Sequence, residues 1–416
     1  MMRRFWQLSF CLILLLMTQP ADAQQAQPNP EKISQQDQHF NMVIQGNNRF
    51  ALSLLKQLHS QYKGNFICSP YSIASGLARI SIGAKRETAN EIQKAVGYSS
   101  SFVPLIGSLD QFFTAQPRKK NDTQLFLASA VWIQEDISLV NAYQYALKRD
   151  FEAETKQVDF KREFVNTIKQ INEWTSTHTN NHVHQMVGSQ DLSDDTQLLL
   201  TTAFYAKGTW AHLFPLKQTT RKPFHINERQ VRQVEMMRTT AQYPLLLQDT
   251  FTLIEIPYAQ QEGSELILSL IIFLPKEKMG WQTLLQEMTI ENVRAWMDGV
   301  RLQNVALELP RFRIDSKMVL DSVLQGMGIK QLFSQKADLS GISEKEGLQL
   351  NRAVHKTLFR ITEEGSDSNA RSTSSVDAQP AGQGNPVELL IDHPFFFMLV
   401  ERNTQSILGM GRILQP

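Results

Sequence analysis

The chain has 416 residues, and its 42 lysines and arginines nearly balance its 41 aspartates and glutamates. A net charge of +1 gives no long-range field that attracts polyanions, so nucleic acid and anionic membranes are disfavoured as partners. A disulfide framework within one mature chain is excluded, because Cys11 lies in an N-terminal apolar segment and leaves Cys68 without a partner. Stability must therefore come from a large core.

The first 23 residues have the pattern of a secretory signal peptide. Arg3 and Arg4 precede an apolar stretch from Phe5 to Met17, and small residues follow at Ala21-Asp22-Ala23. The apolar stretch is shorter than the roughly 20 residues of a membrane-spanning helix. We therefore expect cleavage after Ala23 and a secreted, extracellular protein, or a periplasmic one if the source is a Gram-negative bacterium.

Residues 24–40 are rich in Gln and Pro and poor in large apolar residues, which predicts a flexible tail. The folded part should begin with a helix capped at Asn47 or Asn48, because apolar residues then recur at helical spacing, at Phe50, Leu54, Leu55 and Leu58. From there to residue 365 we find no repeat and no Pro/Gly-rich linker. The pattern predicts a single domain over residues 41–416.

Two local clusters could bind a ligand. Residues Arg118-Lys119-Lys120 could make a weak polyanion contact, although Asp122 follows at once and a solvated turn is the alternative. His178, His182 and His184 could suggest a metal site, but without a nearby acidic or cysteine ligand we interpret them as surface residues. No hydrolase or nucleotide-binding motif occurs, so we expect no enzyme activity, no metal and no cofactor.

Helical and strand-like patterns alternate along the middle of the chain. Helical spacing covers residues 164–174 and 318–327, and strand-like runs cover residues 125–133, 266–274, 305–309 and 395–400. Prolines stand at the ends of strands, where a missing hydrogen-bond donor is tolerated: Pro257, Pro275, Pro310 and Pro394. This mixture predicts an α+β fold with antiparallel sheets.

The segment from Gly365 to Pro386 is rich in Ser, Gly, Ala and Asp and does not fit a packed domain. Side chains of a strand alternate between two faces, and here one parity carries only small residues while the other carries every charge. The segment could therefore become a strand with its small face buried, and a register slip would bury the charges. A low-complexity linker is the alternative. The small parity comprises Ser366, Ser368, Ala370, Ser372, Ser374, Val376 and Ala378.

The sequence on both sides of this segment contains a set of ordered motifs. Before it stand A-V-H-K-T at residues 353–357 and I-T-E-E-G-S at 361–366, and after it D-H-P-F at 392–395 and G-M-G-R at 409–412. Upstream lie N-F-I-C-S-P-Y-S-I at 65–73, I-N-E-W at 171–174, K-G-T-W at 207–210 and A-D-L-S-G at 337–341. Over roughly residues 41–416 the chain resembles the serpins, a family of serine protease inhibitors.

The resemblance implies a serpin fold with three mostly antiparallel β-sheets, about nine helices and an exposed reactive-centre loop over about residues 363–387. It implies a monomer that acts as a suicide substrate. A target serine protease cleaves the loop, stays attached as an acyl ester and is trapped as the loop inserts as a new strand of the central sheet. A non-inhibitory serpin that carries a ligand or acts as a chaperone is the alternative.

The resemblance also implies roles for individual residues. The hinge would comprise Glu363, Glu364, Gly365, Ser366, Ser368 and Ala370, and the sheet-opening region Asn65, Ser69, Ser72, Thr202, Trp210 and His355. The family usually has Asn at the position of Thr202. Where inhibitory members carry a run of alanines, this chain has Ser368-Asn369-Ala370-Arg371. Asn369 and Arg371 lie on the outward-facing parity, so the change should slow insertion less than its chemistry suggests.

The usual spacing from the hinge glycine places the cleaved bond at Gln379-Pro380. Most proteases cleave poorly before a proline, so two neighbouring peptide bonds remain candidates for the cleaved bond. Cleavage at Ala378-Gln379 would suit an elastase-like pocket, and cleavage at Asp377-Ala378 a pocket that selects acidic residues.

Overall fold

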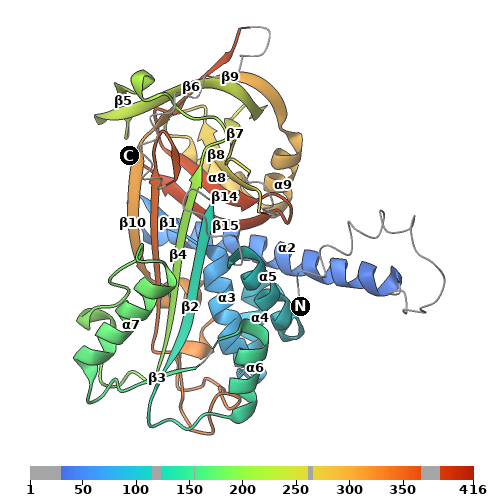
Figure 1. The fold of residues 1–416 in the computed structure, drawn as a ribbon, viewed down its shortest axis with the longest axis vertical. Helices are drawn as coiled ribbons and strands as arrows, with labels where there is room; N and C mark the ends of the chain where they lie inside the picture. The colour runs from blue at the N-terminus through green and yellow to red at the C-terminus, as the bar shows by residue number, and fades with distance from the viewer. Residues whose placement is uncertain (1–29, 115–122, 154, 261–265, 367–384) are drawn as a thin grey trace, which may run out of the picture. The chain divides into compact units, whose positions relative to one another are not determined.

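The computed structural model describes residues 30–114, 123–153, 155–260, 266–366 and 385–416 (Figure 1). The chain divides into two units, Met1–His39 and Phe40–Pro416, and the sheets described below belong to the second. Several predictions fall outside the described residues: the signal peptide with Cys11, the basic cluster Arg118 to Lys120, the hinge residues Ser368 and Ala370, and the candidate bonds at Asp377, Ala378, Gln379 and Pro380.

A nine-stranded sheet forms one half of the fold. Its order is β1 (Phe66–Cys68), β15 (Ser406–Ile413), β14 (Phe395–Glu401), β8 (Leu268–Pro275), β7 (Phe251–Pro257), β6 (Val231–Leu247), β9 (Arg301–Pro310) and β13 (Val387–Leu390), and β5 (Thr220–His225) pairs with β6. The first strand therefore pairs with the last, with Phe66 opposite Arg412.

The described strands form two hydrogen-bonded sheets where the resemblance implies three. The cause is β6, whose 17 residues belong to two groups of strands. Its pairing with β9 runs from Met236 to Leu245, whereas its pairing with β7 covers only Leu245 to Leu247. Two of the three implied sheets are thus continuous through one long strand.

A six-stranded sheet forms the other half. Its order is β10 (Phe312–Val319), β11 (Arg352–Ile361), β12 (Gly365–Ser366), β4 (Leu198–Thr209), β2 (Gln124–Gln134) and β3 (Lys156–Val158). Where the two-residue strand β12 ends, β11 and β4 pair directly and in parallel, residues 352–358 against 199–205. We call this parallel pair the seam.

Nine α-helices occur in the part of the chain that the structure describes, which agrees with the expected number. They are α2 (Pro30–Gln61), α3 (Pro70–Ser81), α4 (Arg86–Val96), α5 (Val103–Thr114), α6 (Asn141–Phe151), α7 (Phe164–His178), α8 (Trp281–Glu287), α9 (Ile290–Gly299) and α10 (Asp321–Gly326). None of the helices in the described ranges is long and apolar enough to span a membrane. The predicted α+β class is confirmed.

The start of α2 differs from the prediction. The helix begins at Pro30, a favoured first helical residue, so the segment expected to be a flexible tail contains helical backbone from there on. Asn47 and Asn48 lie inside the helix, and the prediction that they cap it is wrong. Both are buried, and Asn48 donates to the carbonyl of Gln405 (2.8 Å) and accepts from the amide of Ile407 (3.0 Å).

Two hydrophobic cores lie on opposite faces of the six-stranded sheet. The larger contains side chains from α2, α3 and the nine-stranded sheet together with the even-numbered residues of β4, among them Leu200 and Phe204. The smaller contains the odd-numbered residues of β4, among them Ala203 and Tyr205, with Ile171 of α7. We call the face of the first core inner and the face under α7 outer. Figure 1 shows α7 beside the lower half of this sheet.

Candidate functional site

The site lies along the seam between β4 and β11, and its upper end holds Gly365 and Ser366, the start of the segment that the resemblance identifies as a reactive-centre loop. Ser366 pairs with Ile361 of β11 on one side and with Gly208 of β4 on the other. Gly365 pairs with Thr209, and both residues of β12 are buried. The first loop residues therefore already form a strand between β11 and β4, directly above the point where these two strands meet.

Glycine is required at position 365 because of its backbone conformation and its surroundings. Its φ of +149° lies in a region that residues with a side chain rarely adopt. A Cβ atom at this position would stand 1.8 Å from the carbonyl oxygen of Gly208. Only glycine lets β12 approach β4 this closely.

The residues before β12 are held by backbone hydrogen bonds to the end of β4 and the loop after it. The Trp210 amide donates to the carbonyl of Glu364 (2.9 Å), and its indole Nε1 donates to the carbonyl of Thr362 (2.9 Å). The amide of Phe214 donates to the carbonyl of Glu363 (3.0 Å). The Trp210 ring stacks on Tyr258 with centroids 4.5 Å apart. These contacts place Trp210 at the upper end of the seam.

The Glu363 side chain is 7% exposed and makes three polar contacts with two residues. Thr219 Oγ1 donates to one carboxylate oxygen (2.7 Å), and Arg311 donates to the other from Nε (2.8 Å) and forms an ion pair through Nη2 (2.7 Å). Arg311 also bonds Glu235 (2.6 Å). We call Thr219, Arg311 and Glu363 the hinge clamp. No sequence pattern indicated Arg311.

His355 occupies the middle of the seam and is fully buried. Its Nε2 accepts from the backbone amide of Ser69 (2.9 Å), and because an amide can only donate, the ring proton must lie on Nδ1. Nδ1 therefore donates to Thr202 Oγ1 (2.8 Å), and the Thr357 hydroxyl lies 2.8 Å from Nε2. Burial lowers the pKa of His355 to about 3, so the imidazole is neutral.

Thr202, where the family usually has Asn, contributes a methyl group as well as a hydroxyl. Its Cγ2 atom would lie 2.8 Å from a Cβ at Gly76, so glycine in α3 leaves room for this methyl. On the same inner face, Ser129 of β2 donates to the carbonyl of Ser72 (3.3 Å), and the Ser72 hydroxyl is buried without a partner among the described residues. The Ser72 hydroxyl is therefore available to form a further hydrogen bond at this site.

The structure brings together most of the sheet-opening residues inferred from the sequence. Ser69, Ser72, Thr202 and His355 lie at the middle of the seam, and Ser69 also caps α3 by accepting from the Ser72 amide (3.0 Å). Asn65 does not belong to this group. Its side-chain oxygen accepts from the amides of Leu414 (2.7 Å) and Gln415 (3.1 Å). The prediction for Asn65 is wrong, because the turn before β1 faces the C-terminal residues and not the seam.

The three histidines that follow Trp174 point to different partners. His178 stacks on Trp174 with ring centroids 4.1 Å apart, and His182 stacks on Tyr205 at 3.9 Å. His184 lies 3.2 Å from the hydroxyl of Ser176. Within the described ranges no group of three metal-ligating side chains occurs.

Comparison with known proteins agrees with the geometry of the site. A family model described as Serpin (serine protease inhibitor) matches residues 45–416. Iripin-2 of Ixodes ricinus is 31% identical over 377 residues, which cover 89% of this chain and 93% of that protein. Leukocyte elastase inhibitor of Sus scrofa is 30% identical over 380 residues, which cover 89% of this chain and 98% of that protein.

Solved structures are similar as well. Uncleaved ovalbumin gives a TM-score of 0.80 at 25% identity, covering 90% of this chain and 100% of that chain. Human thyroxine-binding globulin gives a TM-score of 0.80 at 24% identity, covering 91% of this chain and 99% of that chain, and this likeness shows the fold alone. With a family match over most of its length and the hinge strand between β11 and β4, the chain belongs to the serpin family.

Proposed function

We propose that the protein is a secreted inhibitor that traps a serine protease when its cleaved reactive-centre loop enters the seam. Serpins are protease inhibitors and not enzymes, so the chain needs no catalytic residues of its own. The observation that carries the proposal is β12, which is already paired with both β11 and β4 at the upper end of the seam. A strand that continued from Ser366 would pass between these two strands.

The pairing of β12 fixes which faces the inserted residues would occupy. Each further loop residue lies one position lower on β4, so continuing from Ser366 opposite Gly208 places Ser372 opposite Thr202. Directly paired residues share a face, and the even-numbered residues of β4 belong to the inner core. The small parity of the loop would therefore be buried, and Ser372 would reach the neutral imidazole of His355.

The charged parity would lie on the outer face. In the same register Asp367 falls between Lys207 of β4 and Arg360 of β11, which favours the first step of insertion. Arg371 falls beside Lys356, and like charges directly opposite each other are unfavourable. These two pairings predict insertion that starts readily and then slows at Arg371.

The target protease follows from the loop sequence. Ala378-Gln379 offers a small side chain to an elastase-like pocket, and a similar serpin from Sus scrofa is named a leukocyte elastase inhibitor. We therefore propose an elastase-like serine protease as the target. Cleavage at Asp377-Ala378 by an acid-selective protease is the second option.

Incubation of the mature protein with a panel of serine proteases tests the proposal. We expect a complex with an elastase-like enzyme that survives SDS electrophoresis, and mass spectrometry should locate the new C-terminus at Ala378 or a neighbouring residue. The same protease inactivated at its catalytic serine serves as the control and should form no complex. N-terminal sequencing of the exported protein should begin at Gln24, which tests secretion and removal of the signal peptide.

A non-inhibitory carrier or chaperone is the second candidate, and the hinge sequence favours it. Asn369 and Arg371 replace residues that are alanine in inhibitory members, and Arg371 would meet Lys356 on insertion. A loop that is clipped by every protease of the panel, without a stable complex, would contradict inhibition and support this candidate.

A further inference from the structure

The chain between α7 and β4 crosses the outer face of the seam. Residues 179–197, which we call the return segment, contribute Val183, Met186, Val187 and Leu192 to the smaller core. The same core contains residues of β4 and of β11, the latter through Val354 and Leu358. The return segment therefore covers both strands that must separate if the seam opens.

Asp191 ties the return segment to the far side of the seam. Its side chain is 4% exposed and forms an ion pair with Lys317 of β10, and its carboxylate also accepts from the Gly188 amide (2.6 Å). The backbone carbonyl of Asp191 accepts from Nε of Arg352 in β11 (3.0 Å). We call the contacts of Asp191 with Lys317 and Arg352 the latch.

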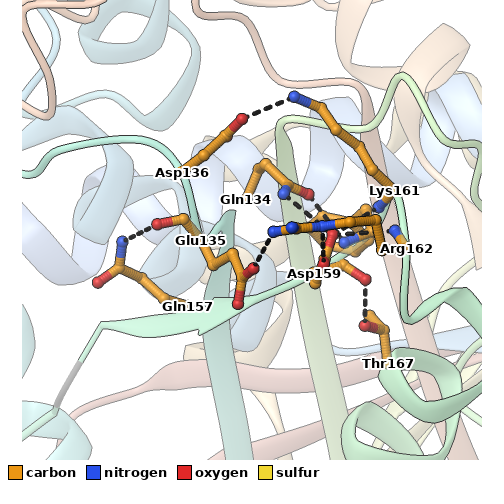
Figure 2. Close-up of polar contacts among 9 residues, drawn as sticks. Gln134, Glu135, Asp136, Gln157, Asp159, Lys161, Arg162 and Thr167 are labelled. Atoms are coloured by element: carbon orange, nitrogen blue, oxygen red, sulfur yellow. Dashed lines mark hydrogen bonds and ion pairs between the residues drawn. The ribbon is translucent and has the colours of Figure 1, made fainter.

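The beginning of α7 is fixed on the β2 side of the seam by polar contacts around Asp159, which Figure 2 draws. The Asp159 carboxylate, between β3 and α7, accepts from Gln134 Nε2 of β2 (3.2 Å) and Nε of Arg162 (2.9 Å). It also accepts from the amides of Lys161 and Arg162, both at 3.0 Å. These hydrogen bonds hold the pKa of Asp159 at about 2.

Further contacts strengthen this anchor. Thr167 Oγ1 of α7 donates to the Asp159 carbonyl (2.8 Å), while Arg162 and Lys161 pair with Glu135 and Asp136, both at 2.8 Å (Figure 2). We call the contacts of Asp159, Lys161 and Arg162 the anchor. Because it joins α7 to β2 and β3, α7 should move with the β2 side of the sheet.

Entry of a strand into the seam would separate β4 from β11 by one strand spacing, about 4.8 Å. The anchor and the latch lie on opposite sides of this gap, so one of them must break. The anchor has many short hydrogen bonds to backbone and side chains, whereas the latch has one ion pair and one hydrogen bond. The latch is therefore the contact that gives way.

A second bridge lies at the foot of the seam. Asn351 Oδ1 accepts from the amides of Gln197 (2.8 Å) and Leu198 (3.1 Å), where β11 and β4 begin. With this lower end bridged and β12 inserted at the upper end, the seam should open as a wedge from above. The latch would then resist the last part of the opening.

We propose that the ion pair between Asp191 and Lys317, supported by Arg352, is a latch that holds the return segment across the seam and sets how readily β4 and β11 separate. Its role in trapping rests on the proposed function. The effect of the latch on opening of the seam in the intact protein is independent of the proposed function and can be measured without a protease.

Hydrogen exchange of the intact protein tests the latch. Lys317→Met removes the charge and keeps the aliphatic chain, and we expect the amides of residues 199–205 and 352–358 to exchange roughly five- to tenfold faster than in the wild type. Asp191→Asn should have a similar effect, and Lys317→Arg should restore slow exchange. Residues 396–399 of β14 serve as the internal reference and should be unchanged.

Lys161→Met is the matched control, because it removes an ion pair on the anchor side that does not cross the seam. It should leave exchange at the seam unchanged. Unchanged exchange in Lys317→Met, or an equal increase in Lys161→Met, would overturn the latch. Failure of the cleaved wild type to gain thermal stability would instead overturn loop insertion and leave the exchange result intact.

Discussion

At the scale of single residues, Glu363 and His355 are both buried polar side chains of the site, and only Glu363 has a charged partner. Glu363 is buried as a carboxylate and has a guanidinium beside it, whereas His355 is buried as a neutral ring among hydroxyls and a backbone amide. The contribution of a buried charge to stability depends on its partner, whereas the contribution of a buried neutral base depends on the pH. The two residues therefore give different tests.

We expect Glu363→Gln to weaken the hinge clamp. The change removes the charge that Arg311 binds while keeping the shape of the side chain, and it should lower the free energy of unfolding by about 1–3 kcal/mol. Urea denaturation measures the loss. Glu235→Gln is the matched control, since Glu235 binds the same arginine but is 53% exposed, and its effect should be below about 1 kcal/mol. Equal losses in both variants would contradict the role of burial.

His355 should make stability depend on pH. Its folded pKa of about 3 lies below the ordinary value of 6.5, so as the pH falls below 6.5 the unfolded chain binds a proton that the folded protein does not. Unfolding is then favoured by about 1.4 kcal/mol per pH unit down to about pH 3. Above pH 7 His355 is neutral in both states, so it adds nothing to the pH dependence of the free energy of unfolding.

Urea denaturation between pH 4 and pH 7 checks this prediction by comparing the wild type with His355→Gln. Other groups also titrate in this range, so the measured quantity is the difference between the two pH profiles. The variant should lose stability less steeply on acidification. Parallel profiles would show that His355 takes up a proton in the folded state.

At the scale of elements, sequence periodicity located the regular strands and the amphipathic helix well. The runs at 125–133 and 395–400 are β2 and β14, and the pattern at 164–174 is α7. The helical pattern at 318–327 was only partly right, because Met318 still belongs to β10 and the helix starts at Asp321. Periodicity does not reveal where a strand pairs, and pairing with β11 extends β10 to Val319.

Gly365→Ala tests the strand β12. The added Cβ would clash with the carbonyl of Gly208 and strain the backbone, so β12 should leave its place between β4 and β11. We expect faster hydrogen exchange at residues 361–366, and more molecules of inhibitor cleaved per protease trapped. Gly64→Ala is the control, because a Cβ at Gly64 would meet no atom within 4 Å, and both measurements should match the wild type.

At the scale of the whole molecule, the sequence alone predicts the family and several residues of the site, but not the contacts between residues far apart in the chain. The resemblance assigned E-E-G to the hinge and V-H-K to the sheet-opening region, and in the structure Gly365 lies at the upper end of the seam and His355 in its middle. Arg311, Asp191 and Lys317 carry no motif, because each acts through a partner far away in the sequence, as Lys317 does with Asp191. Such pairs are visible only once the strands have been assembled.

Cleavage within the loop should make the molecule more stable. About ten new ladder hydrogen bonds at roughly 1 kcal/mol each would add on the order of 10 kcal/mol, and hence a rise in melting temperature on the order of 10–20 °C. Differential scanning calorimetry of intact and cleaved protein measures this rise. Protein cut at Arg371, too close to the hinge for full insertion, is the control and should gain less. Equal melting temperatures for intact and fully cleaved protein would contradict insertion.

The pairing of β1 with β15 has a consequence for biosynthesis. Phe66 lies opposite Arg412, whose guanidinium donates to the carbonyls of Tyr62 (2.6 Å) and Gly64 (2.8 Å). During translation, β1 therefore has no hydrogen-bonded partner strand among the described residues until β15 has been made. Contacts between strands so distant along the chain form slowly, so β1 should be among the last strands to pair, and loss of β15 should leave β1 outside the nine-stranded sheet.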